Sequence, residues 1–131
     1  MAHVQASIGD TAYAVSIRAG RHELAADESR SLGGLDPAPG PYDLVLAGLA
    51  ACTAITLKMY AQRKSWPLAA ARVELHLGRD DPAGARIDRV IELEGELSDE
   101  QRSRLADIAE RTPVTLTLKG GIAIHTTLRS S

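Results

Sequence analysis

The sequence contains no phenylalanine, one tryptophan and three tyrosines, so aromatic side chains cannot fill its interior. We expect a core built from leucine, isoleucine, valine and alanine, consistent with a hydrophobic share of 44%. Because Cys52 is the only cysteine, the chain cannot close a disulfide within itself, which is typical of a cytoplasmic protein. A length of 131 residues predicts one domain, covering 1–131.

The sequence also lacks a large net charge of either sign. The sequence has 15 lysine and arginine residues against 17 aspartate and glutamate residues, and the basic ones form no stripe, so we expect no nucleic-acid partner. The start of the chain lacks the basic and apolar parts of a secretory signal. The uncharged run from Leu44 to Leu57 is shorter than the roughly 20 residues of a membrane span, which predicts no membrane role. The histidines lack ligand spacing, which predicts no metal site, and we expect no other cofactor.

Alternation of apolar and polar residues predicts strands in the first part of the chain. Residues 4–8 and 13–17 indicate a hairpin with a two-residue turn at Gly9-Asp10, and 21–27 fit a short third strand. Residues 28–41 are rich in glycine and proline, which is typical of a loop. One long helix is predicted from Pro41 until Trp66-Pro67 stops it, and its apolar character on nearly every side indicates that other structure surrounds it.

The second part predicts another antiparallel pair, within 71–79 and 86–97, joined by a turn at 80–85. Ser98 and Gln101 form a capping-box pattern that opens a helix with Leu105, Ile108 and Ala109 inward, ending at Thr112-Pro113. The tail predicts either a hairpin around Gly120-Gly121 or a short helical turn before those glycines, followed by a final strand over 122–128. This order indicates an α+β domain whose antiparallel sheet wraps a central helix.

The thiol of Cys52 lies in the most apolar part of the long helix, which leaves two interpretations. It can be a small buried hydrophobe, or it can be a nucleophile activated by a nearby cation or by a helix break at Gly48. Helical spacing places it on a face with apolar residues that would form a substrate pocket in the second case: Val45, Leu49, Ile55 and Met59.

The stretch "GPYDLVLAGLAACTAITLKMYAQRKSWPL" resembles the central-helix signature of the OsmC/Ohr family of osmotically inducible and organic hydroperoxide resistance proteins, in particular its short OsmC-like branch. The similarity consists of a proline near the helix start, an acidic residue just after it, a run of small residues and then Ala-Cys. It extends through "RHELAADES" upstream and "ERTPVTLTLKGGIAI" downstream.

This resemblance implies an intertwined homodimer in which sheets enclose the central helices and the active sites lie at the interface. It also implies a thiol peroxidase in which Cys52 attacks an organic hydroperoxide and becomes a sulfenic acid. In the family an arginine and a glutamate orient the thiolate, and a second cysteine forms a disulfide with it. An apolar pocket would favour organic hydroperoxides over hydrogen peroxide.

The chain departs from the family pattern at the positions of these partners. The second cysteine is replaced by Thr112, so an external thiol, such as a dithiol cofactor or glutathione, would have to reduce the sulfenate. The glutamate position holds Tyr42, with Asp43 beside it as a shorter orienting carboxylate. Either Arg30 or Arg21 can be the thiolate-stabilising arginine.

Two functions therefore remain open. The first is a cytoplasmic homodimeric peroxidase that uses Cys52 without an internal resolving cysteine. The second is a noncatalytic relative that keeps the fold as a binding or stress-associated protein with an inert Cys52. A thioesterase of the hot-dog type would also wrap a helix with a sheet, but it fits the Ala-Cys signature poorly.

Overall fold

The computed structural model describes residues 2–35, 37–79 and 84–129. The chain divides into two compact units, Met1–Ala47 and Gly48–Ser131. The long helix α1, Pro41–Arg63, begins in the first unit and continues into the second. Antiparallel sheets and one long helix make this an α+β protein, as the sequence predicts.

The first unit contains a three-stranded antiparallel sheet in the order β1–β2–β3, built from Val4–Ile8, Val15–Ala19 and His22–Ala26. The predicted hairpin and third strand are therefore confirmed, but the two-residue turn is wrong. Ile8 pairs with Val15, so residues 9–14 form the connection and Tyr13 lies outside the strand. The backbone turns at Ala12, whose φ is 40°.

The predicted loop follows β3 and contains one short 3₁₀ helix, Arg30–Leu32. Its two ends are joined by a 3.0 Å hydrogen bond that Asp27 N donates to the Pro39 carbonyl. Gly34 packs against the Glu28 carbonyl so closely that a Cβ atom would not fit there. A loop closed in this way delivers the chain directly into the first turn of α1.

Helix α1 forms as predicted, with proline in its first turn and its end at Arg63, before Trp66 and Pro67. By length and composition alone it could cross a membrane, with a hydropathy of 1.7 over its most apolar window. Its buried residues recur at intervals of four: Leu49, Thr53, Leu57 and Ala61. That spacing is typical of a helix that packs one side against a protein core, so we read α1 as a core helix.

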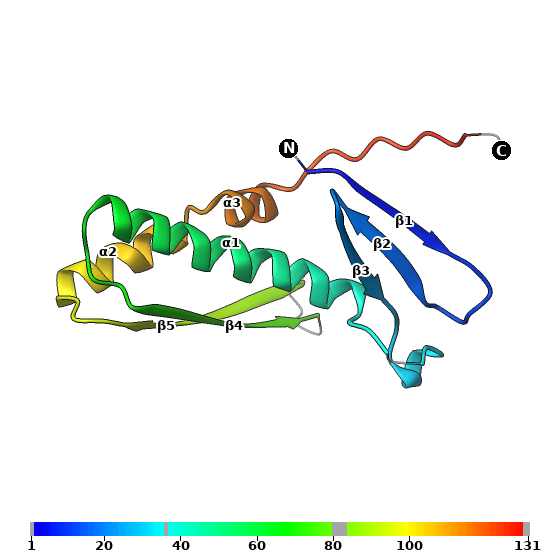
Figure 1. The fold of residues 1–131 in the computed structure, drawn as a ribbon, viewed down its shortest axis with the longest axis horizontal. Helices are drawn as coiled ribbons and strands as arrows, with labels where there is room; N and C mark the ends of the chain where they lie inside the picture. The colour runs from blue at the N-terminus through cyan, green and yellow to red at the C-terminus, as the bar shows by residue number, and fades with distance from the viewer. Residues whose placement is uncertain (1, 36, 80–83, 130–131) are drawn as a thin grey trace. The chain divides into compact units, whose positions relative to one another are not determined.

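The second unit contains the β4–β5 hairpin, Ala70–Gly78 and Arg86–Glu94, which lies along α1 (Figure 1). The predicted turn at 80–85 falls largely outside the described residues. Helix α2, Asp99–Ala109, opens with the predicted capping box between Ser98 and Gln101. Leu57, Leu105 and Ala109 form the buried centre, against which Ile91 and Leu93 of β5 also pack.

Two predictions for the last part of the chain need correction. Residues Pro113–Gly120 form helix α3, with Pro113 in the first turn and Thr112 as N-cap, so the hairpin around Gly120-Gly121 is wrong and the short helical alternative is right. The predicted final strand is absent among the described residues of 122–128, which extend from α3 without strand pairing (Figure 1). A strand needs a hydrogen-bonded neighbour, and none of the described residues pairs with this segment.

Candidate functional site

Cys52 lies in the fourth turn of α1 and is partly buried. Its Sγ atom is 3.9 Å from Thr56 Oγ1, one helical turn further on, which permits a weak hydrogen bond. The helix does not break at Gly48, because α1 is continuous through this position. The thiol is therefore held on a regular helical surface.

The charged residues predicted to act with Cys52 belong to the first unit. Arg21 lies in the turn between β2 and β3, and Arg30 begins the 3₁₀ helix; both are exposed. Asp43 is exposed too, and its Oδ2 accepts a 3.0 Å hydrogen bond from Gly40 N. This contact stabilises the start of α1 in the manner of the second half of a capping box. The proposed roles of these three residues at Cys52 remain predictions.

The residues of the predicted apolar pocket differ in burial. Leu49 is 5% exposed and faces the interior of its unit, whereas Val45, Ile55 and Met59 are 43%, 57% and 51% exposed. Large apolar side chains at such exposure along one helix are unusual for a surface that stays in water. Thr112, at the predicted resolving position, is fully buried.

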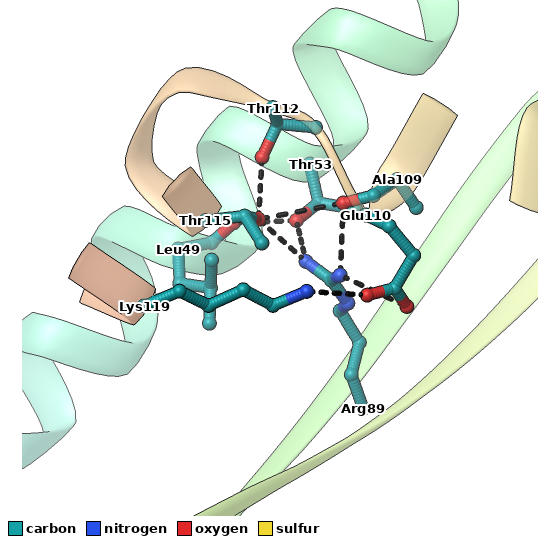
Figure 2. Close-up of polar contacts among 8 residues, drawn as sticks. All are labelled: Leu49, Thr53, Arg89, Ala109, Glu110, Thr112, Thr115 and Lys119. Carbon is teal, nitrogen blue, oxygen red and sulfur yellow. Dashed lines mark hydrogen bonds and ion pairs between the residues drawn. The ribbon is translucent and has the colours of Figure 1, made fainter. Parts of the chain in front are cut away.

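A polar network of side chains lies on the buried side of α1, in the second unit (Figure 2). At its centre is Arg89 of β5, whose Nη1 donates to Thr53 Oγ1 and to Thr115 Oγ1, both at 3.0 Å. Its Nη2 donates to the Ala109 carbonyl at 2.8 Å. One guanidinium thus joins the sheet to α1, to the end of α2 and to the start of α3.

The threonines of this network are linked further. Thr53 Oγ1 donates to the Leu49 carbonyl at 2.7 Å, within α1. Thr112 Oγ1 and Thr115 Oγ1 lie 2.6 Å apart, and Thr115 also donates a long bond to the Ala109 carbonyl. Thr112 therefore uses its hydroxyl to fix the turn between α2 and α3.

Among the described residues, the carboxylate that compensates the buried charge of Arg89 is that of Glu110, which Lys119 shares. Its side chain is 12% exposed, and its Nη2 is 3.8 Å from Glu110 Oε1. Glu110 accepts a 2.8 Å hydrogen bond from Lys119, and this bond, with a smaller contribution from the Arg89 charge, lowers the pKa of the Glu110 carboxyl. Two cations share one anion, so positive charge is in excess here.

A cavity of about 770 Å³ lies beside this network, within the second unit. Its walls combine apolar side chains, among them Leu49, Leu77 and Leu118, with the polar groups of Arg89 and Lys119. Cys52 is not among the described residues that line it. Among the described residues, no three histidine, cysteine or carboxylate side chains gather as metal ligands.

The sequence did contain a signal for Arg89. Along β5 the odd-numbered residues Ile87, Ile91 and Leu93 alternate inward, and Arg89 occupies the same phase. A lone charged residue on the inward phase of a strand requires buried hydrogen-bond partners. Thr53 and Thr115 supply them, but neither threonine has a sequence feature that separates it from its neighbours.

Comparison with known proteins identifies the family to which the chain belongs. The sequence profile described as OsmC-like protein matches residues 33–127. The structure is similar to that of an OsmC-like protein from Mycoplasma pneumoniae, with a TM-score of 0.78 and 20% identity over 92% of this chain and 88% of that one. A search of curated proteins found no match.

Two further solved structures bear the name organic hydroperoxide resistance protein. The one from Legionella pneumophila has a TM-score of 0.68 and 21% identity, over 92% of this chain and 90% of that one. The one from Elizabethkingia anophelis has a TM-score of 0.69 and 17% identity, over 92% and 89%. Since the profile covers most of the sequence and the folds agree, this chain belongs to the OsmC-like protein family.

Proposed function

We propose that this protein is a thiol-dependent peroxidase that reduces organic hydroperoxides with Cys52 and an external thiol. The observation that supports this most directly is the position of the single thiol. Cys52 is partly accessible on α1, within the segment that matches the OsmC-like profile. Solved relatives with the same fold are named for organic hydroperoxide resistance, which supports the substrate class.

The reaction begins with the thiolate of Cys52. Its sulfur attacks the terminal oxygen of the hydroperoxide, so that an S–O bond forms while the O–O bond breaks. The alkoxide takes a proton and leaves as the alcohol, and Cys52 becomes a sulfenic acid. An external thiol then attacks this sulfur and releases water, which leaves a mixed disulfide. A second thiol attacks the external sulfur of that disulfide, so that Cys52 leaves in its reduced form and the two external thiols become a disulfide.

A homodimer is part of this proposal. Ile55 and Met59 are exposed large apolar side chains of α1, whose buried residues Leu49, Thr53, Leu57 and Ala61 pack into the core. Ile122, Ile124 and Leu128, in the unpaired segment after α3, are 68%, 86% and 96% exposed. A second copy would cover such surface and provide the hydrogen-bonded neighbour that an extended segment lacks.

The experiment follows the loss of an organic hydroperoxide such as cumene hydroperoxide with dithiothreitol as the reductant. Wild-type protein should consume the peroxide catalytically, and Cys52→Ser should fall to the background rate. The roles of the first-unit arginines are tested with Arg21→Gln and Arg30→Gln, against Arg18→Gln, whose exposed side chain pairs with Glu23. Equal peroxide loss with wild type and Cys52→Ser would favour the noncatalytic relative.

A further inference from the structure

We propose that Arg89 is a positioning residue for Cys52, because it fixes the turn of α1 that carries the thiol through its hydrogen bond to Thr53. This inference rests on the proposed function, since it concerns the reactivity of the same thiol. Arg89 of β5 thus helps to set the position of the Cys52 sulfur.

The guanidinium is itself held rigidly. It donates to three separate acceptors, on Thr53, Thr115 and Ala109, while its side chain is 12% exposed. A buried planar guanidinium with fixed acceptors has little freedom, because any movement leaves a buried donor unsatisfied. The Ala109 carbonyl adds to this, since it lies in the last turn of α2, where the helix dipole favours a cation.

The hydroxyl of Thr53 makes two hydrogen bonds that hold the helical turn containing Cys52. Thr53 Oγ1 accepts from Arg89 and donates to the carbonyl of Leu49, so residues 49–53 are held against β5. Side chains stand roughly 5 Å from a helix axis, so a rotation of about 10° moves a sulfur atom by about 1 Å. Loss of the Arg89 contact therefore permits a displacement that matters for a nucleophile.

The same anchor reaches Thr112. Arg89 donates to Thr115, whose hydroxyl is 2.6 Å from that of Thr112. Thr112 is the position at which the resemblance implies a second cysteine, which would tie this segment to the Cys52 turn by a disulfide. In this chain, noncovalent bonds to one guanidinium connect the α2–α3 turn with α1.

The test measures the rate at which iodoacetamide alkylates Cys52 in the folded protein, over a pH series that extends to the plateau where the thiol is fully ionised. The variants are Arg89→Lys, Thr53→Val and Thr53→Ser. The matched control is Arg102→Lys, because Arg102 also uses its guanidinium to bind two carbonyls, but these belong to Leu93 and Gly95 and lie outside α1.

Arg89→Lys and Thr53→Val should each change the plateau rate by about 10-fold. Thr53→Ser keeps the hydroxyl and should therefore keep the wild-type rate. Arg102→Lys should lower stability to urea with a rate within about 2-fold of wild type. An unchanged rate in Thr53→Val, or an equal change in Arg102→Lys, would overturn the inference. Where Arg89→Lys does not fold, the two Thr53 variants decide. Alkylation needs no turnover, so a failed peroxidase assay leaves this test intact.

Discussion

Arg104 of α2 donates a 3.1 Å hydrogen bond from Nε to the phenol oxygen of Tyr60 near the end of α1. The Tyr60 ring also meets Trp66 edge to face, with centroids 5.6 Å apart, and Lys64 Nζ lies 5.7 Å from its centroid. These contacts join the last turns of α1 to α2 at the end of the hydrophobic core. They also place a phenol among cations.

The first prediction concerns the ionisation of that phenol. The hydrogen bond from Arg104 is the main cause that lowers the pKa of Tyr60, and the charges of Arg104, Lys64 and Arg111 act in the same direction. Because the folded pKa is below the unfolded one, the phenolate adds stability as pH rises through that range and adds nothing near neutrality. Absorbance at about 295 nm should show one tyrosine ionising below the usual value of about 10.

Removal of the donor provides the control for this titration. Arg104→Gln should move the early transition up toward the usual tyrosine range, whereas Arg72→Gln, at an exposed site on β4, should leave it in place. An unchanged early transition in Arg104→Gln would show that another tyrosine causes it.

The second prediction concerns the core. Leu57 is fully buried against Leu105 and Ala109, so Leu57→Ala should lower the free energy of unfolding by about 2–5 kcal/mol. Urea unfolding followed by circular dichroism measures this. Val90→Ala, at a β5 residue that is 59% exposed, should cost less than about 0.5 kcal/mol. Similar losses in the two variants would contradict this packing.

The third prediction tests the proposed homodimer. Light scattering on wild-type protein should give twice the mass of one chain, and Ile55→Glu should shift the population to single chains, because a carboxylate in an apolar interface loses its hydration. Val90→Glu is the matched control, since Val90 and Ile55 are 59% and 57% exposed. A single-chain mass for the wild type at every concentration would refute the dimer.

The fourth prediction restores a cysteine at the position where the resemblance implies one. Thr112→Cys should lower stability by about 1–3 kcal/mol while reduced, because it disrupts the 2.6 Å hydroxyl contact with Thr115. After one equivalent of organic hydroperoxide, the variant should lose two hydrogen atoms as Cys52 forms a disulfide with the introduced cysteine. Mass spectrometry detects this loss. Stable sulfenic acid on Cys52, with the new thiol still free, would show that the two positions do not meet.

Much of the fold was predictable because its signals are local. Pro41 and the Trp66-Pro67 pair bound α1, and Ser98 with Gln101 opens α2, since helix ends are encoded by capping groups close in sequence. The strands of both sheets followed from alternation. The connection at residues 9–14 was predicted wrongly. Gly9-Asp10 has the composition of a two-residue turn, but Ile8 pairs with Val15, so the connection is longer.

The last part of the chain shows why local signals can mislead. Val114, Leu116 and Leu118 alternate with threonine and lysine as in a strand, yet these residues form α3. Pro113 suits a first helical turn, and the helix brings Thr115 to the guanidinium of Arg89. That contact spans 26 residues of sequence, so no short window of sequence reveals it.

The site was predictable only in part for the same reason. Cys52 stood out as the single thiol and lies in α1 as expected. Arg89 carried a weak signal through its phase on β5, but its partners come from three other parts of the chain. Such a cluster is a property of the folded chain, because each acceptor is unremarkable in its own sequence context.

The location of Trp66 has a practical consequence for studies of this protein. It is the only tryptophan, and it packs in the unit formed by Gly48–Ser131. Its fluorescence therefore follows the melting of that unit, while the sheet of β1, β2 and β3 could unravel without changing the emission. A tryptophan-fluorescence melting curve would report the unit that contains Trp66, and a tryptophan introduced at Tyr13 would give the first unit its own signal.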